Sequence, residues 1–169
     1  MRHILGIVAA LVGVAVLVGL LVGFLLPVEH TATGSREMAG PQHEIWALLT
    51  VVQGYPDWRP DVDSVEILAR GQRGPTRWRE TGPGGVITFL LEEAEPPGRR
   101  VVRIDDPDLP FGGRWIYQLE PVDGGTRVTI TEEGEVRNPV YRLFSRFVIG
   151  HDATINVFLD ALAGRFPER

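Results

Sequence analysis

His151 is the residue whose position in the sequence most invites a chemical role. On a helical wheel of the C-terminal segment it lies about 20° from Phe158, in the middle of an apolar stripe. That stripe also contains Phe147, Ile155 and Leu162. A buried imidazole needs a hydrogen-bond partner, because an unpaired buried polar group costs roughly 1–3 kcal/mol. The partner is a structural neighbour, an ordered water, a ligand or a strand residue such as Glu80.

The remaining residues exclude most familiar catalytic and metal-binding sets. With no cysteine and no lysine, the chain lacks a thiolate nucleophile, a cysteine-ligated zinc and a lysine Schiff base. His43-Glu44 begins like a zinc-protease helix, but Ala47 stands where the second histidine is needed. The turn at 82–85 opens no helix, and the acidic turn at 105–108 lacks the spacing of a calcium loop. We therefore assign no catalytic residue, no metal site and no cofactor.

Composition limits the chain to one folded domain behind an apolar leader. The 169 residues carry a formal net charge of −5, which disfavours nucleic acid as a partner because nucleic-acid binding needs a basic surface. From Ile4 to Leu26 no residue carries a charge, an amide or a hydroxyl. A helix of that length spans roughly 34 Å, enough to cross the ~30 Å hydrocarbon core of a bilayer. We expect a membrane anchor and linker over 1–29 and a folded domain over 30–169.

A cleaved signal peptide is the alternative interpretation of this leader. Signal peptides have shorter apolar regions and end in a small-x-small cleavage site, whereas this run ends in Leu25-Leu26-Pro27-Val28. Arg2 precedes the span, so the positive-inside rule places the N-terminus in the cytoplasm and the domain outside it. Gly19 and Gly23 form a G-x-x-x-G pair through which a homodimer can form.

Hydrophobic alternation and turn residues predict a sheet of seven strands in the folded part. Runs bounded by glycine, proline and aspartate occur at 30–38, 62–69, 76–81, 86–94, 99–104, 114–122 and 126–136. Short consecutive strands with tight turns favour an antiparallel meander over βαβ units. Glu132, Glu133 and Glu135 are interpreted as strand positions that face water.

Two helices are expected around these strands. Gly40-Pro41 opens the first helix, with Ile45 and Leu49 on its apolar face, and it ends near Val52. Asn138-Pro139 opens a long helix that runs to about Gly164. The predicted fold class is therefore α+β, with a curved antiparallel sheet around a long C-terminal helix and one transmembrane helix in front.

The order of these elements, together with residues at their joints, resembles the SRPBCC (START/Bet v 1-like) superfamily, especially its polyketide cyclase/dehydrase-like branch. The matching segments are Ile45-Trp46-Ala47-Leu48-Leu49 after Pro41, Tyr55-Pro56-Asp57-Trp58-Arg59-Pro60, Gly112-Gly113-Arg114-Trp115 with Tyr117, and Gly125 to Thr131. The similarity covers about residues 30–165. Val51 departs from the pattern, because many relatives carry an acid after the first helix.

The resemblance implies a helix-grip fold with a cavity between the sheet and the C-terminal helix. Such cavities hold lipids, sterols, polyketides or other apolar molecules. We expect the cavity to be lined by apolar and aromatic side chains with a few polar groups. The candidate ligand-binding residues are Trp58, Trp78, Glu80, Phe89, Trp115, Tyr117, Phe147, His151 and Ile155. Ordinary core packing is the alternative for each of them, and Trp58 is either a lid or a plug at the edge of the core.

Two functions remain open at this point. The first is a membrane-anchored binding module that holds a small apolar or amphipathic, lipid-like molecule. The second is a cyclase/dehydratase-like enzyme in which His151 and Glu80 act as acid and base. Members of the family include both binders and catalysts, so the resemblance does not decide between them.

Overall fold

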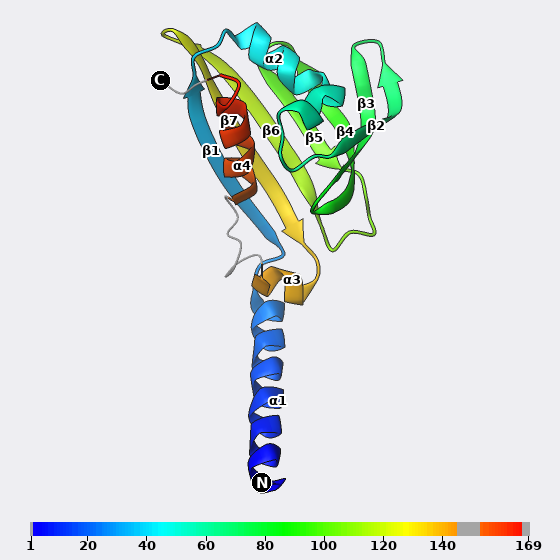
Figure 1. Ribbon diagram of the computed structural model, residues 1–169, viewed down its shortest axis with the longest axis vertical. Coiled ribbons are helices and arrows are strands. Elements are labelled where there is room, and N and C mark those ends of the chain that lie inside the picture. The colour runs from blue at the N-terminus through cyan, green and yellow to red at the C-terminus, as the bar shows by residue number, and fades with distance from the viewer. Residues whose placement is uncertain (1, 145–152, 167–169) are drawn as a thin grey trace.

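The structure is a computed structural model that describes residues 2–144 and 153–166. An N-terminal helix, α1 (Arg2–Leu25), projects from one end of a curved sheet (Figure 1). The strands of the sheet are β1 (Glu29–Met38), β2 (Ser64–Gly71), β3 (Gly74–Gly82), β4 (Gly85–Glu95), β5 (Arg99–Ile104), β6 (Phe111–Val122) and β7 (Gly125–Val136). The other described elements are α2 (Gln42–Thr50), the 3-10 helix η1 (Val52–Asp57), α3 (Pro139–Phe144) and α4 (Ala153–Ala163).

The sheet is antiparallel throughout and runs in the order β1-β7-β6-β5-β4-β3-β2. Strands β2 to β7 form a meander, and β1 pairs with β7 from Glu29↔Glu135 to Met38↔Thr126. The predicted α+β class and all seven strands are confirmed. β6 begins at Phe111, earlier than expected, because Gly112 and Gly113 continue the strand. A Cβ on Gly113 would overlap the backbone of β7, so the close approach of the two strands requires glycine here.

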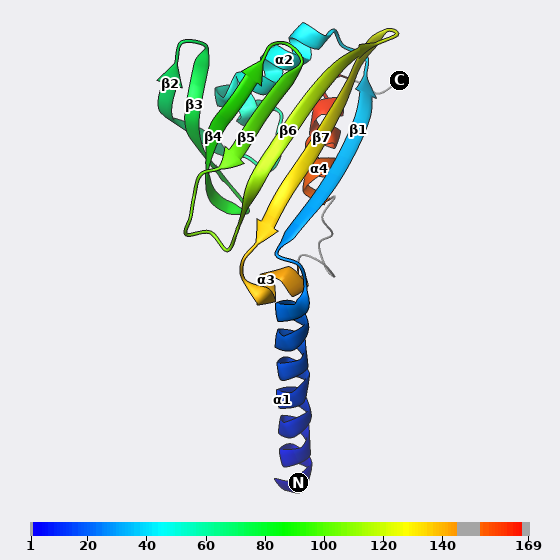
Figure 2. The ribbon, with the colours of Figure 1, turned by 180° about the vertical axis from the view of Figure 1, so that it is seen from behind.

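Both α2 and α4 pack against the same face of the sheet, which we call the inner face (Figures 1 and 2). The buried side chains of α4 are Ile155, Phe158, Leu159 and Leu162. Three of them belong to the apolar stripe predicted for the C-terminal segment. Of the helix expected over 139–164, the structure describes α3 and α4, and residues 145–152 lie outside the described residues.

The opposite, outer face carries arginine–carboxylate pairs, four of them between neighbouring strands and one, Arg77–Asp105, between β3 and the residue that follows β5. The pairs are Arg77–Asp105, Arg79–Glu66, Arg103–Glu92, Arg114–Glu133 and Arg127–Glu37, with N···O distances from 2.6 to 2.8 Å. Each such exposed pair contributes at most about 1 kcal/mol, so the stability of the sheet depends on its inner face.

The end of α1 packs against α3 of the same chain. A Cβ on Gly23 would overlap the carbonyl oxygen of Pro139, and one on Gly19 would lie 3.8 Å from Cδ2 of Leu143. The small residues of this G-x-x-x-G pair therefore serve a close approach within the chain. A homodimer through Gly19 and Gly23 remains a prediction, and it requires α3 to move away from Gly23.

Gly34 of β1 tests the packing of α4 on the sheet. A Cβ at this position would lie 2.6 Å from Cγ2 of Ile155 and 3.2 Å from Cδ1 of Leu159. Gly34→Ala is expected to lower the free energy of unfolding by about 1–3 kcal/mol, because the core is overpacked. Urea unfolding of the full chain in detergent, followed by tryptophan fluorescence, measures this. Gly54→Ala is the control, since no atom lies within 4 Å of its Cβ, and an equal effect of both substitutions would contradict the packing.

Candidate functional site

Aromatic side chains from β3, β4 and β6 line the inner face of the sheet. Trp115 and Tyr117 lie two residues apart on β6, so both point to the same side. On β3 and β4, Trp78 and Phe89 are paired in register, and their rings stack with centroids 5.8 Å apart. Trp78 and Tyr117 are buried, whereas Phe89 and Trp115 are only half-buried.

Phe158 of α4 is the centre of this aromatic set. Its ring lies 5.4 Å from Trp58, 5.7 Å from Trp115 and 5.6 Å from Tyr117, centroid to centroid. The Trp58 and Trp115 contacts are edge-to-face, an arrangement that aromatic pairs favour. Burial raises the pKa of the Tyr117 hydroxyl, which therefore stays protonated at neutral pH.

Glu80 accepts hydrogen bonds from two neighbouring side chains. Trp78 Nε1 donates to Oε1 at 2.8 Å, and Arg59 Nη1 donates to Oε2 at 2.9 Å. The Arg59 guanidinium also bonds Asp61 and lies over the rings of Tyr55 and Phe158. Burial raises the pKa of Glu80, while Arg59 and Trp78 oppose that shift. The carboxylate thus fixes Trp78 and Arg59 in place.

Arg100 of β5 is a buried cation on the same face. Its guanidinium lies 5.1 Å from the centre of the Trp78 ring. Nη1 donates to the carbonyl oxygen of Leu49 and, at 3.0 Å, to the hydroxyl of Tyr55. Nε is buried and has no hydrogen-bond partner among the described residues. These contacts tie the end of α2 and η1 to the centre of the sheet.

The structure brings together six of the nine side chains predicted to bind a ligand. Five of them lie on the inner face of the sheet: Trp78, Glu80, Phe89, Trp115 and Tyr117. The sixth, Trp58, directly follows η1 and packs against that face through Phe158. Ile155 is buried against β1 at Gly34, on another part of the inner face. Phe147 and His151 lie outside the described residues. Trp58 is buried beside Tyr55 and Phe158, which is the position of a plug in the core.

Sequence reasoning missed a histidine–glutamate pair on the inner face. His30 Nε2 lies 3.3 Å from Oε1 of Glu132, and burial lowers the pKa of His30. The expectation that Glu132 faces water is therefore wrong. Glu132 pairs in register with Trp115, so both point inward, and Glu132 is mostly buried. The two-residue alternation along β7, from Val128 through Ile130 to Glu132, predicts that Glu132 points inward.

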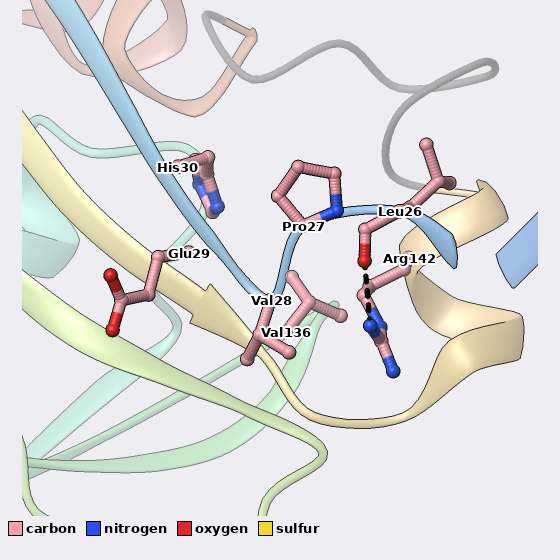
Figure 3. Close-up of a pocket in the computed structure, with 7 residues that line it drawn as sticks. All are labelled: Leu26, Pro27, Val28, Glu29, His30, Val136 and Arg142. Carbon is pink, nitrogen blue, oxygen red and sulfur yellow. Dashed lines mark hydrogen bonds between the residues drawn. The ribbon is translucent and has the colours of Figure 1, made fainter. Parts of the chain in front are cut away.

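Two surface pockets stand out among the described residues, and neither lies between the sheet and α4. One, of about 120 Å³, lies where α1, β1 and α3 meet and is lined by Leu26, Pro27, Val28, Glu29, His30, Val136 and Arg142 (Figure 3). The other, of about 430 Å³, is an open hollow beside the start of α2. The predicted cavity under the C-terminal helix thus stays a prediction.

Residues 29–166 match the sequence profile of a family described as "Polyketide cyclase / dehydrase and lipid transport". A search of curated proteins gives no match. The match covers the whole of the sheet together with α2, α3 and α4.

Solved structures share the fold at low sequence identity. A START superfamily protein from Mycobacterium smegmatis aligns with a TM-score of 0.66 at 20% identity, covering 80% of this chain and 96% of that one. Zhui aromatase/cyclase from Streptomyces sp. R1128 aligns at 0.64 and 17%, covering 81% and 93%. A norcoclaurine synthase point mutant from Thalictrum aligns at 0.63 and 15%, covering 82% and 94%. These alignments confirm the helix-grip fold.

Removing Glu80 tests whether its carboxylate fixes the inner face. Glu80→Ala is expected to lower the free energy of unfolding by about 3 kcal/mol, because it leaves the Arg59 cation and the Trp78 indole N–H without this acceptor. Glu66→Ala, which removes an exposed pair with Arg79, is expected to change it by less than about 1 kcal/mol. Urea unfolding of both variants measures the two changes in the free energy of unfolding. Similar losses in both would show that the buried network stabilises the fold no more than an exposed ion pair.

Proposed function

Because this chain belongs to the polyketide cyclase / dehydrase and lipid transport family, we propose that it is a membrane-anchored binding protein. It holds a small apolar or amphipathic, lipid-like molecule between the inner face of the sheet and the C-terminal helix. The aromatic lining and the buried hydrogen-bond donors of the inner face support this function.

One observation carries the proposal: Phe89 and Trp115 are only half-buried although both point inward. Large aromatic side chains on the inner side of a curved sheet are normally covered, since each contributes about 2–3 kcal/mol when fully buried. Their neighbours Trp78 and Tyr117 are buried in the same face. An apolar ligand over Phe89 and Trp115 completes the burial that the described residues leave unfinished.

Buried donors beside these rings suit the polar end of an amphipathic ligand. Trp58 Nε1 and Arg100 Nε are buried and have no acceptor among the described residues. Buried N–H groups in folded proteins are almost always paired, so an acceptor is expected at each. An oxygen of the ligand or an ordered water supplies it.

Anchoring is supported by α1, the one described helix that is long and apolar enough to cross a membrane. Its apolar stretch, Gly6–Leu25, has a mean hydropathy of 2.9 and is mostly unburied within the structure. In our proposal the N-terminus is cytoplasmic and the domain lies outside, as Arg2 favours. β1 begins at Glu29, shortly after α1 ends at Leu25, so the domain stays close to the bilayer.

The cyclase/dehydratase alternative has less support from the described residues. Glu80 already accepts bonds from Trp78 and Arg59, which occupy both of its carboxylate oxygens. His151, its proposed partner, lies outside the described residues. The alternative remains a prediction that a substrate screen would test.

Native mass spectrometry of the full chain, extracted from host membranes in detergent, tests ligand binding. We expect a copurified apolar molecule whose occupancy falls at least about tenfold in Trp115→Ala, because about 1.4 kcal/mol of lost contact corresponds to that factor. Gln118→Ala is the matched control, since Gln118 lies on the same strand and is exposed. A folded protein that is reproducibly empty would refute the proposed function.

Intact mass and cysteine labelling test the anchor and its orientation. The chain has no native cysteine, so single substitutions report position cleanly. We expect the membrane-bound protein to retain residues 1–26. An impermeant maleimide should label Gly84→Cys in intact cells and His3→Cys only after permeabilisation. A mass lacking the apolar leader would instead identify a signal peptide, and reversed labelling would invert the orientation.

A further inference from the structure

Arg142 of α3 is a buried cation without a carboxylate partner among the described residues. Its exposed fraction is 8%. Nη1 donates to the carbonyl oxygen of Leu26 at 2.8 Å and Nη2 to that of Arg137 at 3.4 Å, while Nε is buried and has no hydrogen-bond partner in the described part of the chain. An arginine keeps its charge at any physiological pH, so burial cannot neutralise it as it can a lysine. A buried charge of this kind is stabilised by an anion nearby.

A pocket next to Arg142 has room for such an anion. Its volume is about 120 Å³, which corresponds to about four water molecules at ~30 Å³ each. Leu26, Pro27, Val28 and Val136 give it apolar walls, and Figure 3 shows the Glu29 carboxylate pointing away from Arg142. The space suits a small anionic group attached to an apolar body, and it is too small for an acyl chain.

The position of the pocket indicates which kind of molecule carries this anionic group. The pocket lies at the end of α1, where the apolar helix gives way to the folded domain (Figures 1 and 3). Val140 and Tyr141 of α3 lie at the same end and are 55% and 52% exposed. Tyrosine is a residue typical of membrane interfaces, where its apolar ring contacts lipid and its hydroxyl is hydrated. Phospholipid phosphates occupy the same layer.

We propose that this pocket binds the phosphate of a phospholipid headgroup, with Arg142 as its cationic partner. The acyl chains remain in the bilayer beside α1, and α3 lies in the interface with Val140 and Tyr141 toward the lipid. This inference rests on the membrane anchoring proposed above, but not on ligand binding at the inner face. Guanidinium and phosphate form strong charge-assisted hydrogen bonds, and Arg142 has N–H groups beyond the two that bond carbonyl oxygens.

The test uses the full chain in phosphate-free dodecyl maltoside micelles, titrated in separate arms. The probes are dioctanoyl phosphatidylglycerol, dioctanoylglycerol and inorganic phosphate, and binding is followed by calorimetry. We expect the phospholipid to bind at least tenfold more tightly than the neutral lipid, and Arg142→Gln to abolish that difference. Arg142→Lys should retain part of it. Arg137→Gln, a matched control on an exposed arginine paired with Glu135, should leave it unchanged.

Each outcome of these titrations either supports or overturns the proposed phosphate site. Equal affinity of the wild-type chain for the two lipids would overturn the proposal, even if Arg142→Gln fails to fold. Binding of inorganic phosphate as tight as that of the phospholipid would identify a soluble anion as the ligand and would also overturn it. Trp115→Ala should leave the difference in affinity between phosphatidylglycerol and dioctanoylglycerol unchanged, because both lipids present the same acyl chains to the inner face, so failure of the inner-face function and failure of this site are distinguishable. A leader removed by cleavage would be seen in the intact mass.

Discussion

The ladder between β1 and β7 joins the beginning of the folded chain to its last strand. It runs from Glu29↔Glu135 to Met38↔Thr126 and is extended by a hydrogen bond from Val136 N–H to the carbonyl oxygen of Val28. Because this pairing fixes the start of β1, it also fixes the end of α1 beside α3. The contact of Gly23 with Pro139 and the bond from Arg142 to Leu26 both depend on it.

The inner face combines aromatic packing with buried charge, and the two depend on one another. Glu80, Arg59 and Arg100 lie among Trp78, Tyr55 and Phe158, where they are largely shielded from water. The pairing of Glu80 with Arg59 offsets part of the desolvation cost, and the aromatic rings offer the cations a favourable surface. A face built in this way is held by directional bonds, which keep Trp115 and Phe89 in fixed positions on the inner side of the sheet.

Much of this arrangement could be predicted from local patterns. Alternation along β6 predicts that Trp115, Tyr117 and Leu119 share one face of the strand. The helical period of α4 predicts that Ile155, Phe158 and Leu162 share one side of the helix. Contacts between distant segments could not be predicted in the same way. The pairing of Arg59 with Glu80 and the bond of Arg142 to Leu26 join segments that are far apart in the sequence, and no local period encodes such contacts. The pair of His30 and Glu132 does not follow from the general expectation that a strand glutamate faces water.

The two attachments of α1 have a mechanical consequence. One is the direct chain connection through Pro27 and Val28 to β1, and the other is the contact of Gly19 and Gly23 with α3. A stalk held at one point can swivel, whereas a stalk held at two points transmits torque. Rotation of α1 about its own axis would therefore rotate the whole sheet with it. The orientation of the inner face relative to a protein bound to α1 would then stay constant.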